Sequence, residues 1–204
     1  VGAVTGELPF PYYASNTIGG TFNGDFSLYD TSIVNTAYNQ SHITGTFSGT
    51  STFRMLGDIN YIYASMEFTN CIFNGPSYFQ NLCTSQFPVG GRPKITLSGI
   101  THFNSDVFFD SYYGYIESNP LANNPVYFNA GTVKVGPYGF SGGSLYLNNI
   151  HSGSGTKIDL ELSGNAVLSV NYPRLHKCHL KGITKLKAPA IYDVTMCEFG
   201  DTTR

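Results

Sequence analysis

The chain has 204 residues, with 11 Lys and Arg against 13 Asp and Glu, a formal net charge of −2 and a pI near 6.2. This length suits one domain with a sizeable core, and we expect a single domain over residues 1–204. The balanced charge excludes a broad basic field, so we expect no nucleic-acid partner. The longest charge-free stretch, between Glu67 and Arg92, is broken by Pro76 and Pro88, which argues against membrane insertion.

The composition favours strands over helices. The chain contains 15 Phe, 15 Tyr and 23 Gly, and only 12% of its residues are charged. Aromatic residues suit pleated surfaces, and the scarcity of charge leaves little from which to build exposed helical faces. We therefore predict an all-β fold. The sequence opens at Val1 without a charged leader segment, and we expect it to be excised from a longer polypeptide.

Whole motifs recur at a period near 25 residues. The segment 18–24 reappears 25 positions later as 43–49, with its Ile, Thr, Phe and two of its Gly residues matched. A third copy over 68–75 starts in phase and drifts by one residue at Phe73. A period of this length is typical of one coil of a solenoid.

A second pattern consists of an apolar residue, two further residues, a Cys, one residue and another apolar residue. It occurs at 68–73, 175–180 and 194–199. Strict alternation would place the first apolar residue and the Cys on opposite faces, because they are three positions apart. All three side chains face inward only if the two intervening residues turn a corner, and Asn70 suits a corner because Asn tolerates left-handed geometry. Strand, corner and strand make up the coil of a parallel β-solenoid.

Alternating apolar residues predict half-buried strands at 95–97, 126–128, 133–135, 145–147 and 158–162. We expect the turn-rich segments 76–93 and 110–125 to protrude from the coils as loops. The Asn-Gly pairs at 23–24 and 74–75 also fit hairpins, so a β-sandwich or jelly roll is the alternative fold. The repetition of whole motifs favours a parallel β-solenoid (β-helix) with protruding loops.

The segment 68–75, Phe-Thr-Asn-Cys-Ile-Phe-Asn-Gly, resembles the coils of phage tail-spike and tail-fibre β-helices and of the pectate-lyase-like superfamily. This resemblance implies a homotrimer on a virion tail appendage or extracellular surface that recognises a host cell-surface glycan or receptor. The stretches 138–150 and 178–186 are similar to the leucine-rich repeats of bacterial surface proteins. That second similarity implies, as an alternative, a surface adhesin with helical segments opposite its strands.

The four cysteines are Cys71, Cys83, Cys178 and Cys197. Three of them occupy the same inward position of the corner pattern, so we expect at least three to be reduced and inaccessible. Cys178 and Cys197 would lie one coil apart, a separation that also permits a disulfide. Neither a Cys-x-x-Cys pair nor spaced His ligands accompany them, so we predict no metal site, and we expect no cofactor.

The richest group of carboxylates comprises Asp106, Asp110 and Glu117. Tail-spike and polysaccharide-lyase relatives cut glycans with paired Asp or Glu residues, one as acid and one as nucleophile or base. These three residues are therefore the candidate catalytic groups of an alternative function, a glycan depolymerase or lyase. Solvated loop carboxylates would have the same spacing.

Three tyrosines, Tyr112, Tyr113 and Tyr115, lie among these acids and are the candidate ligand-binding residues. Tyrosine substitutes for the absent tryptophan in stacking on sugar rings, and with Ser, Gly and Asn it is typical of polar recognition surfaces. The sequence leaves open whether the protein is an enzyme. A recognition module without catalytic activity is the function we expect first.

Overall fold

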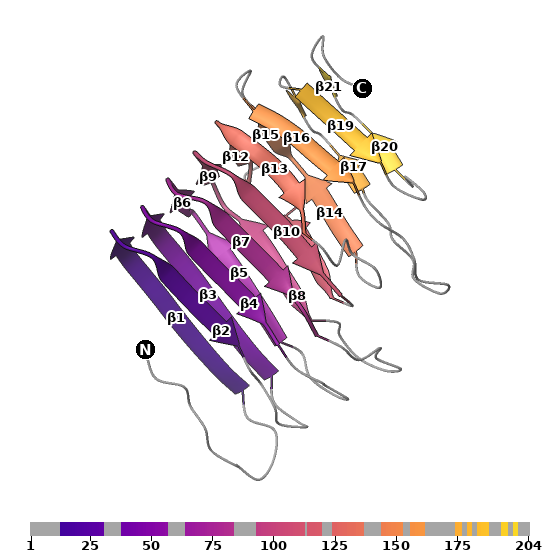
Figure 1. Cartoon of the computed structure of the whole chain (residues 1–204). Helices are drawn as coiled ribbons and strands as arrows, with labels where there is room; N and C mark the ends of the chain where they lie inside the picture. The colour runs from indigo at the N-terminus through magenta and orange to yellow at the C-terminus, as the bar shows by residue number, and fades with distance from the viewer. Residues whose placement is uncertain are drawn as a thin grey trace.

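The computed structural model describes thirteen segments of the chain. They are residues 13–30, 38–56, 64–83, 93–112, 114–119, 124–136, 144–152, 156–161, 174–176, 179–180, 183–187, 193–195 and 198–199. All of the regular structure in these segments is β-strand, in two parallel sheets that are stacked coil upon coil (Figure 1). The predicted all-β parallel β-solenoid is confirmed, and the sandwich or jelly-roll alternative, which requires antiparallel hairpins, is wrong.

The larger sheet has fourteen strands. It begins with two long strands, β1 (Tyr13–Phe22) and β3 (Tyr38–Phe47). In later coils the equivalent strand is divided into two by a corner. The first limb contains β5 (Ala64–Thr69), β8 (Lys94–Ser98), β11 (Tyr115–Ser118), β14 (Ser144–Asn148), β17 (Arg174–His176) and β20 (Asp193–Thr195). The second limb contains β6 (Ile72–Phe73), β9 (Thr101–Phe103), β12 (Val126–Phe128), β15 (Ile150–Ser152), β18 (His179–Leu180) and β21 (Glu198–Phe199).

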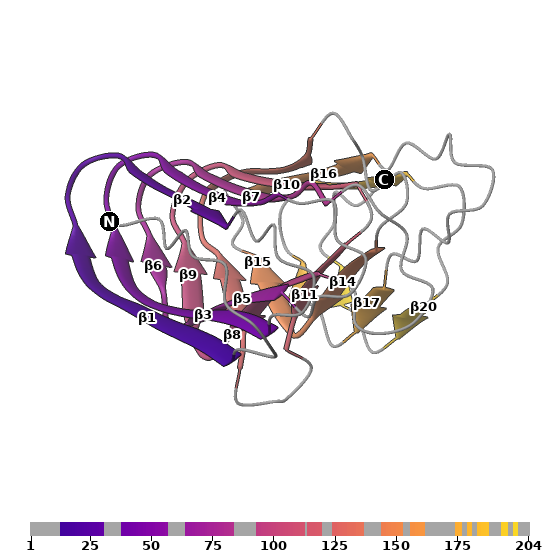
Figure 2. The ribbon, with the colours of Figure 1, turned by 90° about the horizontal axis from the view of Figure 1, so that it is seen from below.

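The smaller sheet takes one strand from each successive coil, and seen end-on it lies opposite the first limb of the larger sheet (Figure 2). Its strands are β2 (Phe26–Asp30), β4 (Ser51–Met55), β7 (Ser77–Asn81), β10 (Val107–Ser111), β13 (Gly131–Val135), β16 (Thr156–Glu161) and β19 (Ile183–Lys187). The two limbs and the smaller sheet therefore present three outward faces.

The strand register matches the sequence repeat. Ile18 pairs with Ile43 and Phe22 with Phe47, which is the 25-residue period. Phe47 pairs with Phe73, which is the drift of one residue seen in the third copy. The repeat therefore predicts which residues stack on one another, because parallel strands in register place equivalent side chains in columns along the solenoid.

The corner between the two limbs lies where the cysteine pattern predicts it. Asn70 has a φ of +54° and is exposed, whereas Phe68, Cys71 and Phe73 are all fully buried. The Asn70 side-chain oxygen accepts a hydrogen bond from the backbone N–H of Ile100 in the next coil, at 2.9 Å. The corner is thus held by its own side chain as well as by backbone geometry.

The two expected loops each contain a strand, so those assignments were wrong in part. Strand β7 occupies the start of the segment 76–93, and β11 lies within 110–125. The inward positions of β7 include Ser77 and Asn81, both fully buried. Polar residues at inward positions break the apolar alternation by which a strand is recognised in sequence.

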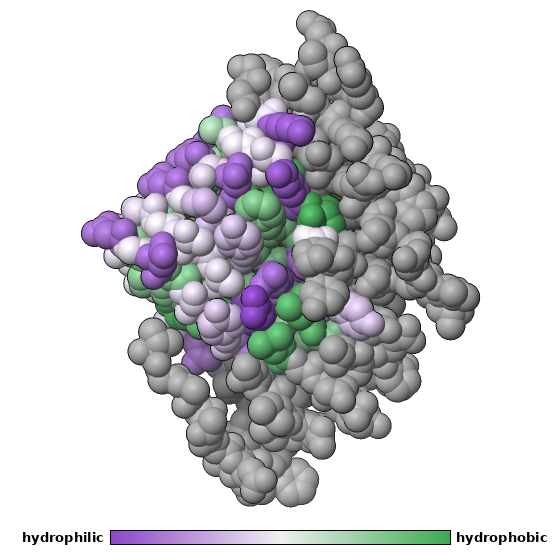
Figure 3. Space-filling view, viewed as in Figure 1, coloured by the Kyte–Doolittle hydropathy of each residue, from purple (hydrophilic) through white to green (hydrophobic). Residues whose placement is uncertain are grey.

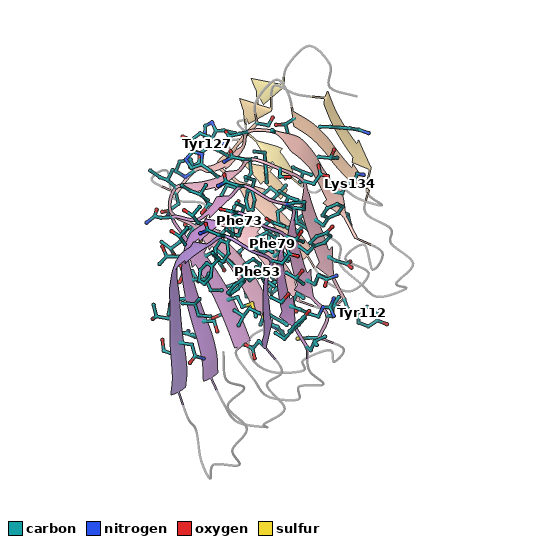
Figure 4. All side chains as sticks on the ribbon, turned by 60° about the vertical axis from the view of Figure 1, so that its left-hand side comes forward. Phe53, Phe73, Phe79, Tyr112, Tyr127 and Lys134 are labelled. Atoms are coloured by element: carbon teal, nitrogen blue, oxygen red, sulfur yellow. The ribbon has the colours of Figure 1, made fainter. Side chains whose placement is uncertain are left out.

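Phenylalanine rings fill the interior. One column runs through five successive coils with ring centroids 4.8 to 5.2 Å apart and interplanar angles of 8° to 22°. It consists of Phe22, Phe47, Phe73, Phe103 and Phe128. A second column, Phe53, Phe79 and Phe109, belongs to the smaller sheet and meets the first largely edge to face (Figure 4). Offset stacks along each column and edge contacts between columns are both favourable aromatic geometries.

We predict that Phe73→Ala lowers the free energy of unfolding by about 3 to 5 kcal/mol, because Phe73 is fully buried and its ring touches both columns. The neighbouring Ile72→Ala should cost far less, because Ile72 is 38% exposed on the outer face. Urea denaturation of both variants measures the difference. Similar losses for the two would contradict the assignment of inward and outward faces.

Candidate functional site

Asp106 lies in the turn between β9 and β10, where it acts as a cap for the next coil. Its Oδ1 accepts a hydrogen bond from the backbone N–H of Thr132 at 2.7 Å. In the first coil Asp25 makes the same contact to the N–H of Thr50 at 2.9 Å. This repetition of one contact at two turns gives Asp106 a structural role, since it satisfies a backbone donor at the start of the adjacent strand.

Asp110 lies near the other end of β10. Asp110 is 1% exposed, and its carboxyl group packs against Gly136. A side chain at position 136 would clash with it, because an added Cβ atom would lie 2.6 Å from the carboxyl carbon. The Asp106 carboxylate is thus bonded to the backbone at the turn, and the Asp110 carboxyl group is buried within the sheet, so Asp110 does not face an open groove as a glycosidase carboxylate does.

Glu117 belongs to the other sheet. It lies on the outward face of β11, with Oε1 3.0 Å from Lys94 Nζ, and it accepts a longer hydrogen bond, 3.5 Å, from the Thr96 hydroxyl. The three candidate catalytic residues therefore lie in a turn, in a buried position of the smaller sheet and on the outside of the larger sheet. The structure does not bring them together.

The candidate tyrosines also separate. Tyr112 directly follows β10, donates its backbone N–H to Asn81 O at 2.9 Å and lies far from Tyr127 (Figure 4). Tyr113 lies outside the described residues. Tyr115 is on the outward face of β11, two residues from Glu117. Of the five candidate residues that the structure describes, Tyr115 and Glu117 share the outward face of β11.

Tyr146 on β14 completes this surface. Its register partner is Glu117, and its ring lies 5.7 Å from the ring of Tyr115 at an angle of 37°. Side chains from three adjacent coils, β8, β11 and β14, thus meet on the outside of the first limb. Lys94, Tyr115, Glu117 and Tyr146 are partly exposed, whereas Thr96 is buried beneath Glu117, at 8% exposure. We call this surface the tyrosine face and define it as Lys94, Thr96, Tyr115, Glu117 and Tyr146.

Both tyrosines are half-buried, and their register neighbours on the adjacent strands are not aromatic. Tyr115 pairs with Lys94 on one side and Ser144 on the other, while Tyr146 lies between Glu117 and Arg174. An apolar ring with a phenolic hydroxyl, beside an ammonium and a carboxylate, is a combination that recognises hydroxyl-rich rings. The tyrosine face is therefore the candidate functional site.

A second polar surface lies on the second limb. His102, Tyr127 and His151 stack in register, with centroids 4.8 Å and 5.1 Å apart. Beside them the side-chain amides form a ladder, in which Asn104 donates to Asn74 at 2.8 Å and Asn129 donates to Asn104 at 2.7 Å. Both faces of the Tyr127 ring are therefore occupied by the two histidine rings.

The outer face of the smaller sheet combines aromatic and basic residues. Tyr78 and Phe108 stack at 4.5 Å with an interplanar angle of 4°, and the exposed Lys134 follows in the same row. The guanidinium of Arg54 lies 5.4 Å from the ring centroid of Tyr29. In the described part of the surface seen in Figure 3, hydrophobic residues occur in small groups among polar ones.

Sequence reasoning missed Tyr146 for a definable reason. The row Thr96, Glu117 and Tyr146 has spacings of 21 and 29 residues, because the connections between these coils differ in length. The second-limb ladder has spacings of 25 and 24 residues, close to the sequence period. Its three rings could have been aligned from the repeat alone.

Cys71 and Cys83 are buried free thiols, which agrees with the prediction for these two, while the expectation of at least three reduced cysteines stays a prediction. The Cys71 thiol donates to the carbonyl of Ile43 at 3.3 Å, and burial raises its pKa from 9.0 to about 12. Burial, with a smaller contribution from the charge of Asp30, raises the pKa of Cys83 to about 12 as well. Cys178 and Cys197 lie outside the described residues.

Within the described segments, no group of three or more His, Cys, Asp and Glu side chains could hold a metal ion. The same segments contain no helix long and apolar enough to cross a bilayer.

Comparisons with protein-family models, with curated proteins and with solved structures found no match to this chain.

We predict that Asp106→Ala lowers the free energy of unfolding by about 1 to 3 kcal/mol, because it leaves the N–H of Thr132 without its charged acceptor. Asp106→Asn keeps a side-chain oxygen in place and should lose less. Thermal unfolding of both variants, followed by circular dichroism, checks this order. Equal stability of Asp106→Ala and the parent chain would show that the cap is unimportant.

We also predict an alkaline loss of stability that depends on the buried thiols. Between about pH 9 and pH 12 the unfolded chain loses thiol protons that the folded chain keeps, so the folded state is progressively destabilised as the pH rises. Each thiol contributes a slope of up to about 1.36 kcal/mol per pH unit. Denaturant titrations at pH 7.5 to 10.5 should show a shallower decline for Cys71→Ala/Cys83→Ala than for the parent chain. Parallel declines would place the two thiols in contact with solvent.

Proposed function

We propose that this chain is a recognition module without catalytic activity, part of a phage tail fibre, tail spike or similar surface appendage, and that it binds a host cell-surface glycan. The observation that carries the proposal is the tyrosine face, where the half-buried rings of Tyr115 and Tyr146 lie in contact beside the Lys94–Glu117 pair. The assignment to a surface appendage is supported by the parallel β-solenoid architecture and by the resemblance of its coils.

The chemistry of the tyrosine face fits a sugar better than an ionic polymer. Lys94 and Glu117 are 3.0 Å apart and offset each other's charge, so the surface has no net attraction for a polyanion. The ammonium donates hydrogen bonds, the carboxylate accepts them, and the Thr96 and tyrosine hydroxyls do both. Apolar ring faces between such groups match the alternation of C–H faces and hydroxyl edges on a sugar ring.

The scaffold lowers the cost of binding. Four of the five residues are on the strands β8 and β11, which pair with each other in register, and the fifth is on β14, which pairs with β11. Side chains fixed on strands that are paired on both sides lose little conformational freedom when a ligand binds. A rigid face of this kind suits an extended polysaccharide that lies across several coils.

The alternatives find less support in the described residues. A depolymerase needs two carboxylates facing one groove, and Asp106, Asp110 and Glu117 lie on separate parts of the solenoid. A leucine-rich-repeat adhesin would carry helical segments in the coils of β14 and β17. The second sheet of those coils contributes the strands β16 and β19 instead. The expected homotrimer remains a prediction.

We predict that Tyr115→Ala and Tyr146→Ala each weaken binding to the cognate glycan by about tenfold, because truncating a central aromatic contact costs on the order of 1 kcal/mol or more. Tyr29→Ala is the matched control, since Tyr29 is 51% exposed on the smaller sheet and away from the tyrosine face. A glycan array identifies the ligand, and titration calorimetry measures the loss. Binding that tolerates both substitutions would rule out this face.

The same samples separate binding from cleavage. We expect no release of reducing ends from the bound polysaccharide over many hours. Release that disappears in the Asp106→Ala/Asp110→Ala/Glu117→Ala variant would instead support the depolymerase function.

A further inference from the structure

The amide ladder on the second limb ends at a reactive pair of residues. Asn74 is exposed in the turn that follows β6, and Gly75 comes directly after it. An asparagine before a glycine is open to attack from its own backbone, because glycine has no side chain to keep its nitrogen away from the side-chain carbonyl carbon. The equivalent residues of the next two coils, Asn104 and Asn129, are followed by a serine and an alanine instead.

Coil stacking explains why glycine occupies position 75. A Cβ atom on Gly75 would clash with the carbonyl oxygen of Gly49 in the preceding coil. The φ of Gly75 does not lie in the left-handed range, so the requirement for glycine comes from packing alone. In the preceding coil the residue before the glycine is Ser48. The architecture therefore requires the glycine of this pair but not the asparagine.

The ladder prepares the side-chain carbonyl of Asn74 for attack. Asn104 donates a hydrogen bond from its Nδ2 to Asn74 Oδ1 at 2.8 Å. Attack on the carbonyl carbon places negative charge on this oxygen. A donor that is already aimed at the oxygen stabilises the charge, as the donors of an oxyanion hole do.

The two nitrogens that react are not held by hydrogen bonds. Among the described residues, none accepts a hydrogen bond from Asn74 Nδ2 or from the backbone N–H of Gly75. The other ladder residues differ, because Asn104 Nδ2 donates to Asn74 and Asn129 Nδ2 donates to Asn104. Loss of the side-chain nitrogen from either of them would break a ladder hydrogen bond, whereas its loss from Asn74 breaks none.

The second Asn-Gly pair of the described segments lacks the donor. Asn23 is exposed and precedes Gly24, and its counterpart in the following coil is Ser48. No described residue donates a hydrogen bond to the side-chain oxygen of Asn23. Within the described part of the chain, only Asn74 combines a following glycine, a donor to its oxygen and an uncommitted nitrogen.

We propose that Asn74 is a site of spontaneous modification, at which the asparagine becomes an aspartate through a cyclic imide. The Gly75 nitrogen gives up its proton and forms a bond to Asn74 Cγ. The Cγ–Nδ2 bond breaks, and the side-chain nitrogen leaves as ammonia with that proton. Water then opens the imide, giving aspartate if the new bond is cleaved and isoaspartate if the backbone bond is cleaved. This inference does not depend on the proposed function.

Aspartate suits this end of the ladder. Position 74 acts only as an acceptor in the ladder, and a carboxylate accepts a hydrogen bond from Asn104 more strongly than an amide does. Isoaspartate would instead lengthen the backbone by one carbon in a turn where Gly75 packs closely against Gly49. The fold therefore favours aspartate. Its formation adds one negative charge to the second limb and changes the formal net charge of the chain from −2 to −3.

Mass spectrometry of the folded chain, incubated for weeks at mildly alkaline pH in water enriched in heavy oxygen, tests the proposal. Labelled oxygen enters only those residues whose imide is opened during the incubation, so conversion during later digestion is not counted. We expect label at Asn74 and none at Asn104 or Asn129. If Asn74 stays unlabelled in the folded chain but is converted in denaturant, the fold protects this residue and the proposal is overturned.

Asn104→Ala tests the donor. The variant should slow the reaction of Asn74 by about tenfold, less than the loss of an enclosed oxyanion donor, because both side chains are exposed to water. Asn129→Ala is the matched control, since it removes a ladder residue but keeps the hydrogen bond between Asn104 and Asn74. It should react at the rate of the parent chain. An unchanged rate in Asn104→Ala would overturn the role of the ladder.

Asn74→Asp supplies the expected product from the start. Its melting temperature should equal or exceed that of the parent chain, because the carboxylate keeps the hydrogen bond from Asn104. A lower melting temperature would contradict the inference that the fold favours aspartate at position 74.

Discussion

The in-register stacking of parallel strands is the constraint on which the rest of this structure depends. Strand spacing in a parallel sheet is about 4.8 Å, and the ring centroids of the Phe22-to-Phe128 column lie 4.8 to 5.2 Å apart. A planar ring is one of the few large side chains that can repeat at this distance without leaving a void or a clash. The phenylalanine content of the chain is therefore a consequence of its architecture.

The same spacing governs the polar columns. Side-chain amides at one strand spacing can donate along the column, as Asn129 does to Asn104 and Asn104 to Asn74. Aspartates at the turns reach the next backbone N–H, and glycines permit the closest approach of successive turns. Each of these contacts joins one coil to the next, so every coil depends on its neighbours for stability. This dependence on nearest neighbours is what makes solenoids quasi-one-dimensional.

The sequence predicts the part of the fold that repeats. The 25-residue repeat predicts the register of β1 on β3, and the spacing of Phe68, Cys71 and Phe73 predicts the corner at Asn70. The sequence does not predict β7 or β11, because both strands contain polar residues that break the apolar alternation. It does not predict the tyrosine face either, because the connections between β8, β11 and β14 differ in length. Carboxylates that are close in sequence, Asp106, Asp110 and Glu117, diverge because a coil turns through three faces within the distance of one repeat.

The proposed binding surface lies on the outside of the first limb, where the columns of outward side chains are mixed. Inward positions are committed to stacking, and on the other two faces the described rings largely stack on one another, as Tyr127 does between two histidines and Tyr78 does on Phe108. On the first limb the rows change residue type at every coil, so that Tyr115 follows Lys94 and Tyr146 follows Glu117. A column of unlike residues contributes less to stacking and leaves its functional groups available. At some surface positions successive coils carry unlike residues, which do not stack on one another. A solenoid can acquire a binding site at such positions without losing the interactions that hold its coils together.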